Sequence, residues 1–222
     1  MTAARIPWTT VLLDVDGTIV DSAGVVIRSF QRTAEDLGLP PLPDDDYRPF
    51  VGPPLFTSFE RLGLRGDELG RAVEHYRSVY SGLYLEPDPY PGIAELLADL
   101  DAAGLALATA TSKQLHMARG QLEHLDLARH FDAIAGATPD PACTKATVIR
   151  DALSQLTALG RDVSRPVLVG DRFWDVEGGA EAGVPVIGAG WGYGEPGELD
   201  GAWALAPDVA SLRALLLGAE TA

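Results

Sequence analysis

Three short apolar runs of this sequence each end in side chains that can do chemistry. Apolar runs of this length, bounded by turn residues, are typical of strands buried in a parallel sheet. Because the carboxyl ends of parallel strands meet at one edge of the sheet, we expect the side chains that follow the runs to lie close together. The runs and their following residues are 11–13 with Asp14 and Asp16, 105–110 with Thr111, Ser112 and Lys113, and 166–170 with Asp171 and Asp175.

Helical spacing of apolar residues separates most of these runs, for example at 93–103, 144–159 and 175–182. Strands that alternate with helices predict an α/β fold with a doubly wound parallel sheet. The stretch between the first two runs is longer than a single crossover helix and contains proline-rich loops and further helical patterns. We therefore expect a discontinuous core domain of residues 1–19 and 88–222, with a helical cap-like domain of residues 20–87 inserted into it.

Charge and hydropathy narrow the possible partners. The formal net charge of the 222 residues is -15, which argues against nucleic acid and against an anionic membrane surface, because both attract basic proteins. No stretch reaches the length of about 18 apolar residues that a membrane span needs, and the single cysteine, Cys143, excludes an intrachain disulfide. We expect a cytoplasmic protein, either a monomer or a homodimer, that binds a small molecule.

The acidic residues at the strand ends call for a cation. In an extended segment residues i and i+2 point to the same side, so Asp14 and Asp16 can face one small volume, and like charges that close need a counterion or a shared proton. Asp171 and Asp175 reach the same edge of the sheet, and so can Lys145 at the start of its helix. Oxygen ligands with open positions suit Mg²⁺, which in turn favours a phosphorylated ligand.

Four short motifs in this order resemble those of the haloacid dehalogenase superfamily. They are DVDGT at 14–18, Thr111 after its strand, Lys145, and GDRFWD at 170–175. The resemblance covers nearly the whole chain, and the inserted helical segment falls where the superfamily's subclass with a helical cap of the C1 type carries that cap. The strings GPPL at 52–55, TSK at 111–113 and WGYGEPGEL at 191–199 look like the phosphoglycolate phosphatase-like branch, which includes nucleotidases.

The resemblance implies a Mg²⁺-dependent phosphatase with a Rossmann-like core. Asp14 would attack phosphorus to give an aspartyl phosphate, Asp16 would protonate the leaving oxygen and later accept a proton from water, and Lys145 would spread the remaining charge. Because Asp16 is present, we favour a phosphatase over a dehalogenase, which has no acid at that position.

The resemblance also assigns binding residues. The metal ligands it implies are Asp14, the main-chain carbonyl of Asp16, Asp171 and Asp175, with Asp175 as a ligand or as a partner of one. The phosphoryl group would be held by Thr111, Ser112, Gly17 and Thr18. The leaving group would contact Arg48, Gly52 and Lys113.

Several alternatives use the same residues or the same fold. A 5'-nucleotidase or a phosphomutase would differ only in the substrate or the acceptor, and a protein that binds a phosphorylated ligand without turnover would keep the pocket alone. Receiver domains of signalling relays share an acidic pocket but are about half as long. The glycine-rich string at 188–194 has the composition of a dinucleotide loop, although no crossover helix opens after it.

Overall fold

The computed structural model describes residues 6–51, 55–138, 140 and 142–218. The chain divides into two compact units. One unit comprises Met1–Val20 and Pro89–Ala222, and the other comprises Asp21–Asp88. The sheet belongs to the first unit.

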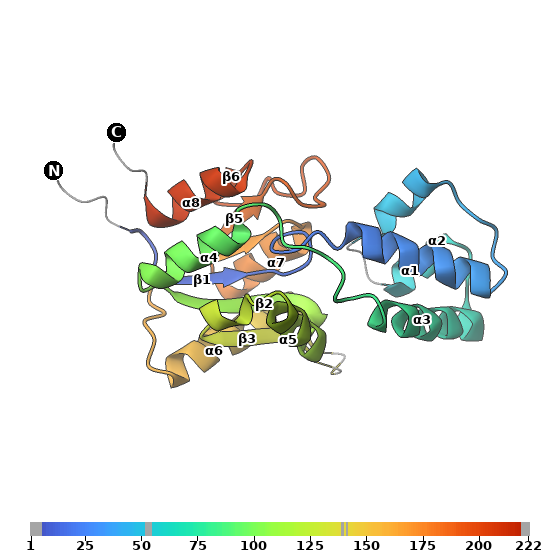
Figure 1. Cartoon of the computed structure of the whole chain (residues 1–222), viewed down its shortest axis with the longest axis horizontal. Coiled ribbons are helices and arrows are strands. Elements are labelled where there is room, and N and C mark those ends of the chain that lie inside the picture. Colours follow the sequence, from blue (N-terminus) through green and yellow to red (C-terminus); the bar gives the residue numbers. More distant parts are fainter. Residues whose placement is uncertain (1–5, 52–54, 139, 141, 219–222) are drawn as a thin grey trace. The chain divides into compact units, whose positions relative to one another are not determined.

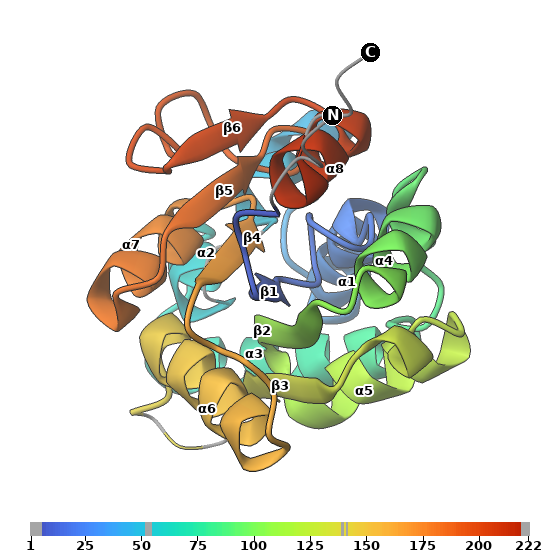
Figure 2. The ribbon, with the colours of Figure 1, turned by 90° about the vertical axis from the view of Figure 1, so that its left-hand side faces the viewer.

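In the described residues, six parallel strands form one sheet in the order β3-β2-β1-β4-β5-β6. The sheet appears in Figure 1, and the strand order can be followed in Figure 2, where β4 is labelled as well. This arrangement confirms the predicted doubly wound α/β fold, because β1 lies centrally and later strands were added on both of its sides. The strands are β1 Thr10–Leu13, β2 Ala106–Gln114, β3 Ala133–Ala137, β4 Pro166–Gly170, β5 Val186–Ala189 and β6 Ala204–Ala206.

Helices cover both faces of the sheet (Figure 2). One face packs against α4 Ile93–Ala102, α5 Leu115–His124 and α8 Val209–Leu217, and the other packs against α6 Lys145–Ala158 and α7 Phe173–Ala182. Side chains alternate between these two cores along β1. A buried leucine or valine stabilises such a core by about 1.5–3 kcal/mol. A short 3-10 helix, Ala128–His130, precedes β3.

The β1 strand positions the first aspartate. All four of its residues are buried, and it pairs with β2 on one side and β4 on the other. The ladder extends one residue further, because the N–H of Asp14 donates to the carbonyl of Val169 over 2.9 Å. Asp14 therefore stands at the carboxyl edge of the sheet, between two neighbouring strands.

The β2 strand is longer than the sequence predicted. We expected it to end at Ala110, but it runs to Gln114. Its pairing with β3 reaches Thr111 and resumes at Gln114 after a register shift, which is a bulge in the strand. The alternation of buried and exposed residues continues through the polar end of β2: Thr111 and Lys113 are buried, whereas Ser112 is exposed. Polar residues ended the apolar run without ending the strand.

The second unit is helical and has a core of its own. Its elements are α1 Ala23–Asp36, a 3-10 helix at Asp44–Phe50, α2 Leu55–Arg61 and α3 Gly66–Ser81. The ring of Phe30 lies at the centre of this core, with ring centroids 5.0 Å from Phe59 and 4.6 Å from Tyr76. The helical patterns that the sequence shows in this stretch correspond to these helices.

Two connections join the units. Val20 and Pro89 form an antiparallel bridge, the N–H of Tyr90 donates to the carbonyl of Ile19 over 2.9 Å, and the N–H of Asp21 donates to the carbonyl of Asp88 over 3.1 Å. The chain thus leaves and re-enters the first unit at adjacent points. Across the described residues, no helix combines the length and the apolar character that crossing a bilayer requires.

Candidate active site

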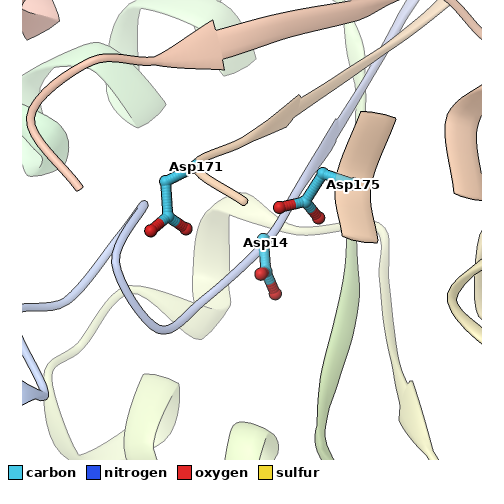
Figure 3. Close-up of side chains that lie close together, drawn as sticks. All are labelled: Asp14, Asp171 and Asp175. Atoms are coloured by element: carbon cyan, nitrogen blue, oxygen red, sulfur yellow. The ribbon is translucent and has the colours of Figure 1, made fainter. Parts of the chain in front are cut away.

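Three aspartates converge at the carboxyl edge of β1 and β4. Asp14 follows β1, Asp171 follows β4, and Asp175 lies in the first turn of α7. Each offers a carboxylate oxygen, and these three oxygens lie within 4.8 Å of one another (Figure 3). The convergence follows from the parallel pairing of β1 with β4, which brings both strand ends to the same place,.

Burial makes this acidic cluster electrostatically costly. Burial, with the charges of Asp175 and Asp14, raises the pKa of Asp171 to about 8, although the Tyr193 N–H and the Thr18 hydroxyl oppose the rise. Burial likewise raises the pKa of Asp14 to about 6, against the attraction of Lys145. Carboxylates this close cannot all ionise without a compensating cation. The cluster therefore has the ligand chemistry of a site for a hard metal ion,.

Lys145 supplies part of the compensating charge. Its ammonium nitrogen Nζ lies 3.2 Å from Oδ1 of Asp14 and 2.5 Å from Oδ1 of Asp175, and only 6 % of its side chain is exposed. Burial by itself lowers the pKa of Lys145, but the two carboxylates outweigh burial and the net pKa is raised. The ammonium thus stays charged inside the site.

The start of α6 fixes this lysine. The side chains and main-chain amides of Thr144 and Thr147 cap the helix reciprocally, with N–H to Oγ1 distances of 3.3 Å and 2.8 Å. Capping of this kind is worth about 1 kcal/mol. A lysine at a helix start is usually solvated, whereas here the cap places it in the first turn against the acidic cluster.

Asp175 bridges the cluster and the turn that follows β4. Its Oδ2 atom accepts the Arg172 N–H over 3.0 Å, while Oδ1 faces Lys145. The Arg172 guanidinium in turn holds Glu198 through two hydrogen bonds of 2.7 and 3.1 Å. Asp175 therefore already has a partner at each oxygen, which fits the alternative that it orients its neighbours.

A glycine-rich loop after β5 completes the surroundings of Asp171. The N–H of Tyr193 donates to Oδ2 of Asp171 over 2.8 Å, and the Thr18 hydroxyl donates to Oδ1 over 3.2 Å. A Cβ atom at Gly192 would lie 2.3 Å from Cβ of Asp171, and one at Gly17, where φ is +80°, would lie 2.2 Å from its carboxylate. Glycine is needed at both positions to let the backbone approach Asp171 so closely.

Sequence reasoning missed the role of this loop. The string at 188–194 has the composition of a dinucleotide loop, an alternative that the sequence disfavours because no crossover helix follows. In the structure its Trp191 donates from Nε1 to the Thr18 carbonyl over 3.2 Å, and the next residues lie against Asp171. The available signal was the series of glycines at 188, 190, 192 and 194, in and directly after the strand β5, because glycines at such a place are typical of close backbone approach.

Three predicted site residues lie at the end of β2, and two of them contact an aspartate of the site. The Thr111 side chain hydrogen-bonds to Asp14 and opposes the rise in the pKa of that aspartate that burial causes. Lys113 Nζ lies 2.9 Å from Oδ1 and 3.2 Å from Oδ2 of Asp16. Ser112 lies between them in the strand and is exposed.

Two predicted contact residues belong to the other unit. Arg48 is an exposed residue of the 3-10 helix Asp44–Phe50. Gly52 lies outside the residues that the structure describes. The contacts of both with a leaving group stay predictions.

Comparisons with known proteins agree with this geometry. Residues 11–189 match the family model described as haloacid dehalogenase-like hydrolase. The tyrosine-protein kinase PtkA of Mycobacterium tuberculosis is 39 % identical over 192 residues, 86 % of this chain, and the chain spans 65 % of that relative's length. A phosphoglycolate phosphatase of Caulobacter vibrioides is 34 % identical over 193 residues, 84 % of this chain and 81 % of the relative.

A solved structure extends the agreement to the fold. The crystal structure of a predicted phosphatase from Clostridium acetobutylicum superimposes with a TM-score of 0.84 at 33 % identity, over 96 % of this chain and 99 % of the other. The family model spans the carboxyl edge from β1 to β5, and with it the whole acidic cluster. The chain therefore belongs to the haloacid dehalogenase-like hydrolases.

Proposed function

We propose that this chain is a Mg²⁺-dependent phosphatase that hydrolyses a small phosphate monoester, most like a phosphoglycolate phosphatase, through an aspartyl-phosphate intermediate. The observation that carries the proposal is the position of Asp14. Its carboxylate is 13 % exposed, stands at a central strand end, and is contacted by Lys145 and Thr111. A carboxylate in such surroundings is held in place for attack on an electrophile.

In the first half-reaction a carboxylate oxygen of Asp14 forms a bond to phosphorus while the ester P–O bond breaks. Asp16 gives its proton to the departing alkoxide, so that an alcohol leaves. In the second half-reaction a water attacks the phosphorus, Asp16 takes a proton from that water, and the bond between phosphorus and Asp14 breaks. Inorganic phosphate is released, and both aspartates return to their starting states.

The residues around Asp14 would stabilise the phosphoryl group during both transfers. Lys145 offers a buried positive charge beside the nucleophile. Thr111 and Ser112 are the proposed side-chain donors to the phosphoryl oxygens. The main-chain N–H groups of Gly17 and Thr18 donate to the carbonyls of Val20 and Val15, over 2.9 and 3.4 Å, so the contact proposed for them requires these two hydrogen bonds to open.

Mg²⁺ fits the donor set, because buried carboxylates with raised pKa values at Asp14 and Asp171 favour a hard divalent cation. We propose that Asp14, the Asp16 carbonyl and Asp171 hold it, with Asp175 as a further ligand or as a partner of one. When bound, this ion offsets the repulsion between a carboxylate nucleophile and a phosphate dianion.

The helical unit Asp21–Asp88 is proposed to act as a cap that excludes water during the first transfer. Its position between two connecting segments supports this role. Arg48 and the segment that contains Gly52 are the proposed contacts for the leaving group. We place the reaction in the cytoplasm, in a monomer or homodimer.

The test is phosphate release from p-nitrophenyl phosphate, phosphoglycolate, nucleoside monophosphates and sugar phosphates, each with Mg²⁺ and with EDTA. Borohydride reduction during turnover should convert position 14 to homoserine, because an acyl phosphate is reduced and a free carboxylate is not. Turnover without modification at Asp14 would contradict the covalent mechanism. Absence of turnover across the panel would contradict the phosphatase.

A second candidate follows from the relative PtkA, which is named a tyrosine-protein kinase. Phosphoryl transfer to a tyrosine hydroxyl would need a nucleotide donor and an acceptor other than water at the same cluster. Incubation with ATP labelled at the γ-phosphate, followed by phosphoamino-acid analysis, separates the two. Label in phosphotyrosine would favour the kinase, and label released as inorganic phosphate would favour hydrolysis.

A further inference from the structure

Lys113, the first of the two lysines in the chain, is buried against Asp16, the second aspartate after β1. The sequence contains two lysines against fifteen arginines, and they pair with the two aspartates separately: Lys145 with Asp14, and Lys113 with Asp16. Lysine is a compact charge on a thin stem. It can therefore place an ammonium group in a confined site that the wide guanidinium group of arginine does not suit.

The ammonium of Lys113 contacts both oxygens of Asp16, at 2.9 and 3.2 Å. The lysine side chain is only 3 % exposed, whereas the Asp16 side chain is 32 % exposed. An ammonium this deeply buried offers little surface to a substrate, but the carboxylate that it holds remains accessible. The asymmetry favours a lysine that acts on Asp16 over one that contacts the leaving group itself.

The backbone at Lys113 is fixed from two sides. Its N–H donates to Oγ1 of Thr111 over 3.1 Å, at the bulge where the pairing of β2 with β3 shifts register. On the other side β3 approaches so closely that a Cβ at Gly136 would lie 2.8 Å from the Lys113 carbonyl oxygen. Bulges re-aim side chains at the ends of strands, and this one directs Lys113 toward Asp16.

We propose that Lys113 is a positioning residue for Asp16. It holds the carboxyl group of Asp16 in the orientation from which this group gives a proton to the leaving oxygen and later takes one from the attacking water. This inference rests on the proposed phosphatase function. Lys113 itself forms and breaks no bond. By holding Asp16 it would raise the rate of the step in which Asp16 gives up its proton, without tightening the binding of the substrate.

The leaving group distinguishes this role from direct substrate binding. p-Nitrophenolate is a stable anion and departs with little protonation, whereas an alkoxide needs a proton as the P–O bond breaks. Loss of acid positioning should therefore slow alkyl esters far more than the nitrophenyl ester. Loss of a substrate contact should raise KM on alkyl esters instead.

The kinetic experiment compares wild type with Lys113→Met, which keeps an unbranched stem and removes the ammonium group. The two substrates are p-nitrophenyl phosphate and the alkyl phosphate that wild type hydrolyses fastest. We expect kcat on the alkyl ester to fall about 10- to 100-fold, kcat on the nitrophenyl ester to fall less than about threefold, and KM to stay within about threefold of wild type. Lys113→Arg keeps the positive charge, so its kcat on the alkyl ester should lie between those of wild type and Lys113→Met. It serves as a second variant if the Lys113→Met protein folds poorly. The control is Gln114→Met, at the next position of β2, which is exposed. It should leave kcat and KM unchanged on both esters.

The double variant Lys113→Met with Asp16→Asn should be no slower than Asp16→Asn alone, because both changes remove the same acid. Additive losses, equal losses on both esters, or a raised KM with unchanged kcat would each overturn the positioning role.

A spectroscopic readout tests the pairing without any turnover. With two lysines in the chain, protein labelled with ¹⁵N-lysine gives two side-chain ammonium signals, which Lys113→Met assigns. Asp16→Asn should shift the Lys113 signal and leave the Lys145 signal nearly unchanged. An unshifted Lys113 signal would overturn the inference even if the phosphatase is active. A shifted signal in a protein inert toward every ester would instead place the failure in the proposed function.

Discussion

The two ends of the parallel sheet treat their charged groups in opposite ways. At the amino end, charged side chains are matched locally: Arg165 donates to the Pro7 carbonyl over 2.7 Å, and Ser164 holds the pKa of Asp162 below its usual range. At the carboxyl end, burial and neighbouring carboxylates raise the pKa of Asp171 to about 8. The charged groups at the amino end are satisfied by their neighbours, whereas those at the carboxyl end repel one another in a way that a bound cation can relieve.

The largest expected difference between the two ends is in catalysis. Asp14→Asn should lower kcat/KM for p-nitrophenyl phosphate in Mg²⁺ by about 10⁴-fold or more, because it removes the nucleophile. Asp162→Asn, an exposed aspartate at the opposite end, should stay within about twofold. Comparable losses from both variants would show that the effect is on folding, which circular dichroism of each protein checks.

The second largest expected difference between the two ends of the sheet is in metal binding. Mg²⁺ at 100 times its Kd stabilises the folded protein by about 2.7 kcal/mol, which for a chain of this size raises Tm by about 5–10 °C. Asp171→Asn should abolish this rise, and Asp162→Asn should keep it. Thermal unfolding with Mg²⁺ and with EDTA measures both. A rise that survives Asp171→Asn would place the ion elsewhere.

Replacing one aspartate at each end should change the free energy of unfolding of the metal-free protein in opposite directions. The pKa of Asp171 is raised in the fold, so the folded protein retains a proton that the unfolded chain loses near pH 4, and stability falls as pH increases from about 4 to about 8. Asp171→Asn should therefore stabilise the metal-free protein at pH 8, by about 1–2 kcal/mol, and do so less at pH 5. Asp162→Asn should be neutral or slightly destabilising, since the pKa of Asp162 is lowered. Urea unfolding in EDTA at both pH values tests the signs.

The smallest expected effect concerns the backbone around Asp171. A methyl group at Gly192 would overlap Asp171, so Gly192→Ala should weaken Mg²⁺ binding by about tenfold, through displacement of one ligand. Gly160→Ala is the matched control, because its Cβ would meet open space and its cost would be local strain at a φ of +74°,. Isothermal titration calorimetry with Mg²⁺ measures the affinity of both variants for the ion. Equal affinities would mean that the loop adapts without moving Asp171.

Most of the fold could be predicted from the periodicity of the sequence. The run at 11–13 and the run at 166–170 are strands β1 and β4, and the helical spacing at 144–159 is α6. These segments are predictable because buried strands and amphipathic helices carry their apolar pattern within the element itself. The end of β2 was mispredicted, since Thr111 and Lys113 are polar and buried, and hydrophobicity does not mark such residues as strand.

The contacts of the candidate site were less predictable than its members. Asp14, Asp171 and Asp175 could be placed at one sheet edge from topology alone, and they do lie together. Which lysine pairs with which aspartate depends on a bulge in β2 and on a helix cap at Thr144, neither of which leaves a period in the sequence. The loop around Asp171 depends on glycines whose significance lies in the atoms that approach them.

The bridge between Val20 and Pro89 has a consequence for how such a chain can be built and rebuilt. The insertion begins and ends at residues that are hydrogen-bonded neighbours, so for the folding of the first unit it is equivalent to a long hairpin loop. The entropic cost of closing a loop grows only slowly with the length of the loop. A tight turn grafted between these two residues should therefore leave a sheet domain that still folds. By the same token, helical inserts could be exchanged at this junction between related chains as interchangeable modules.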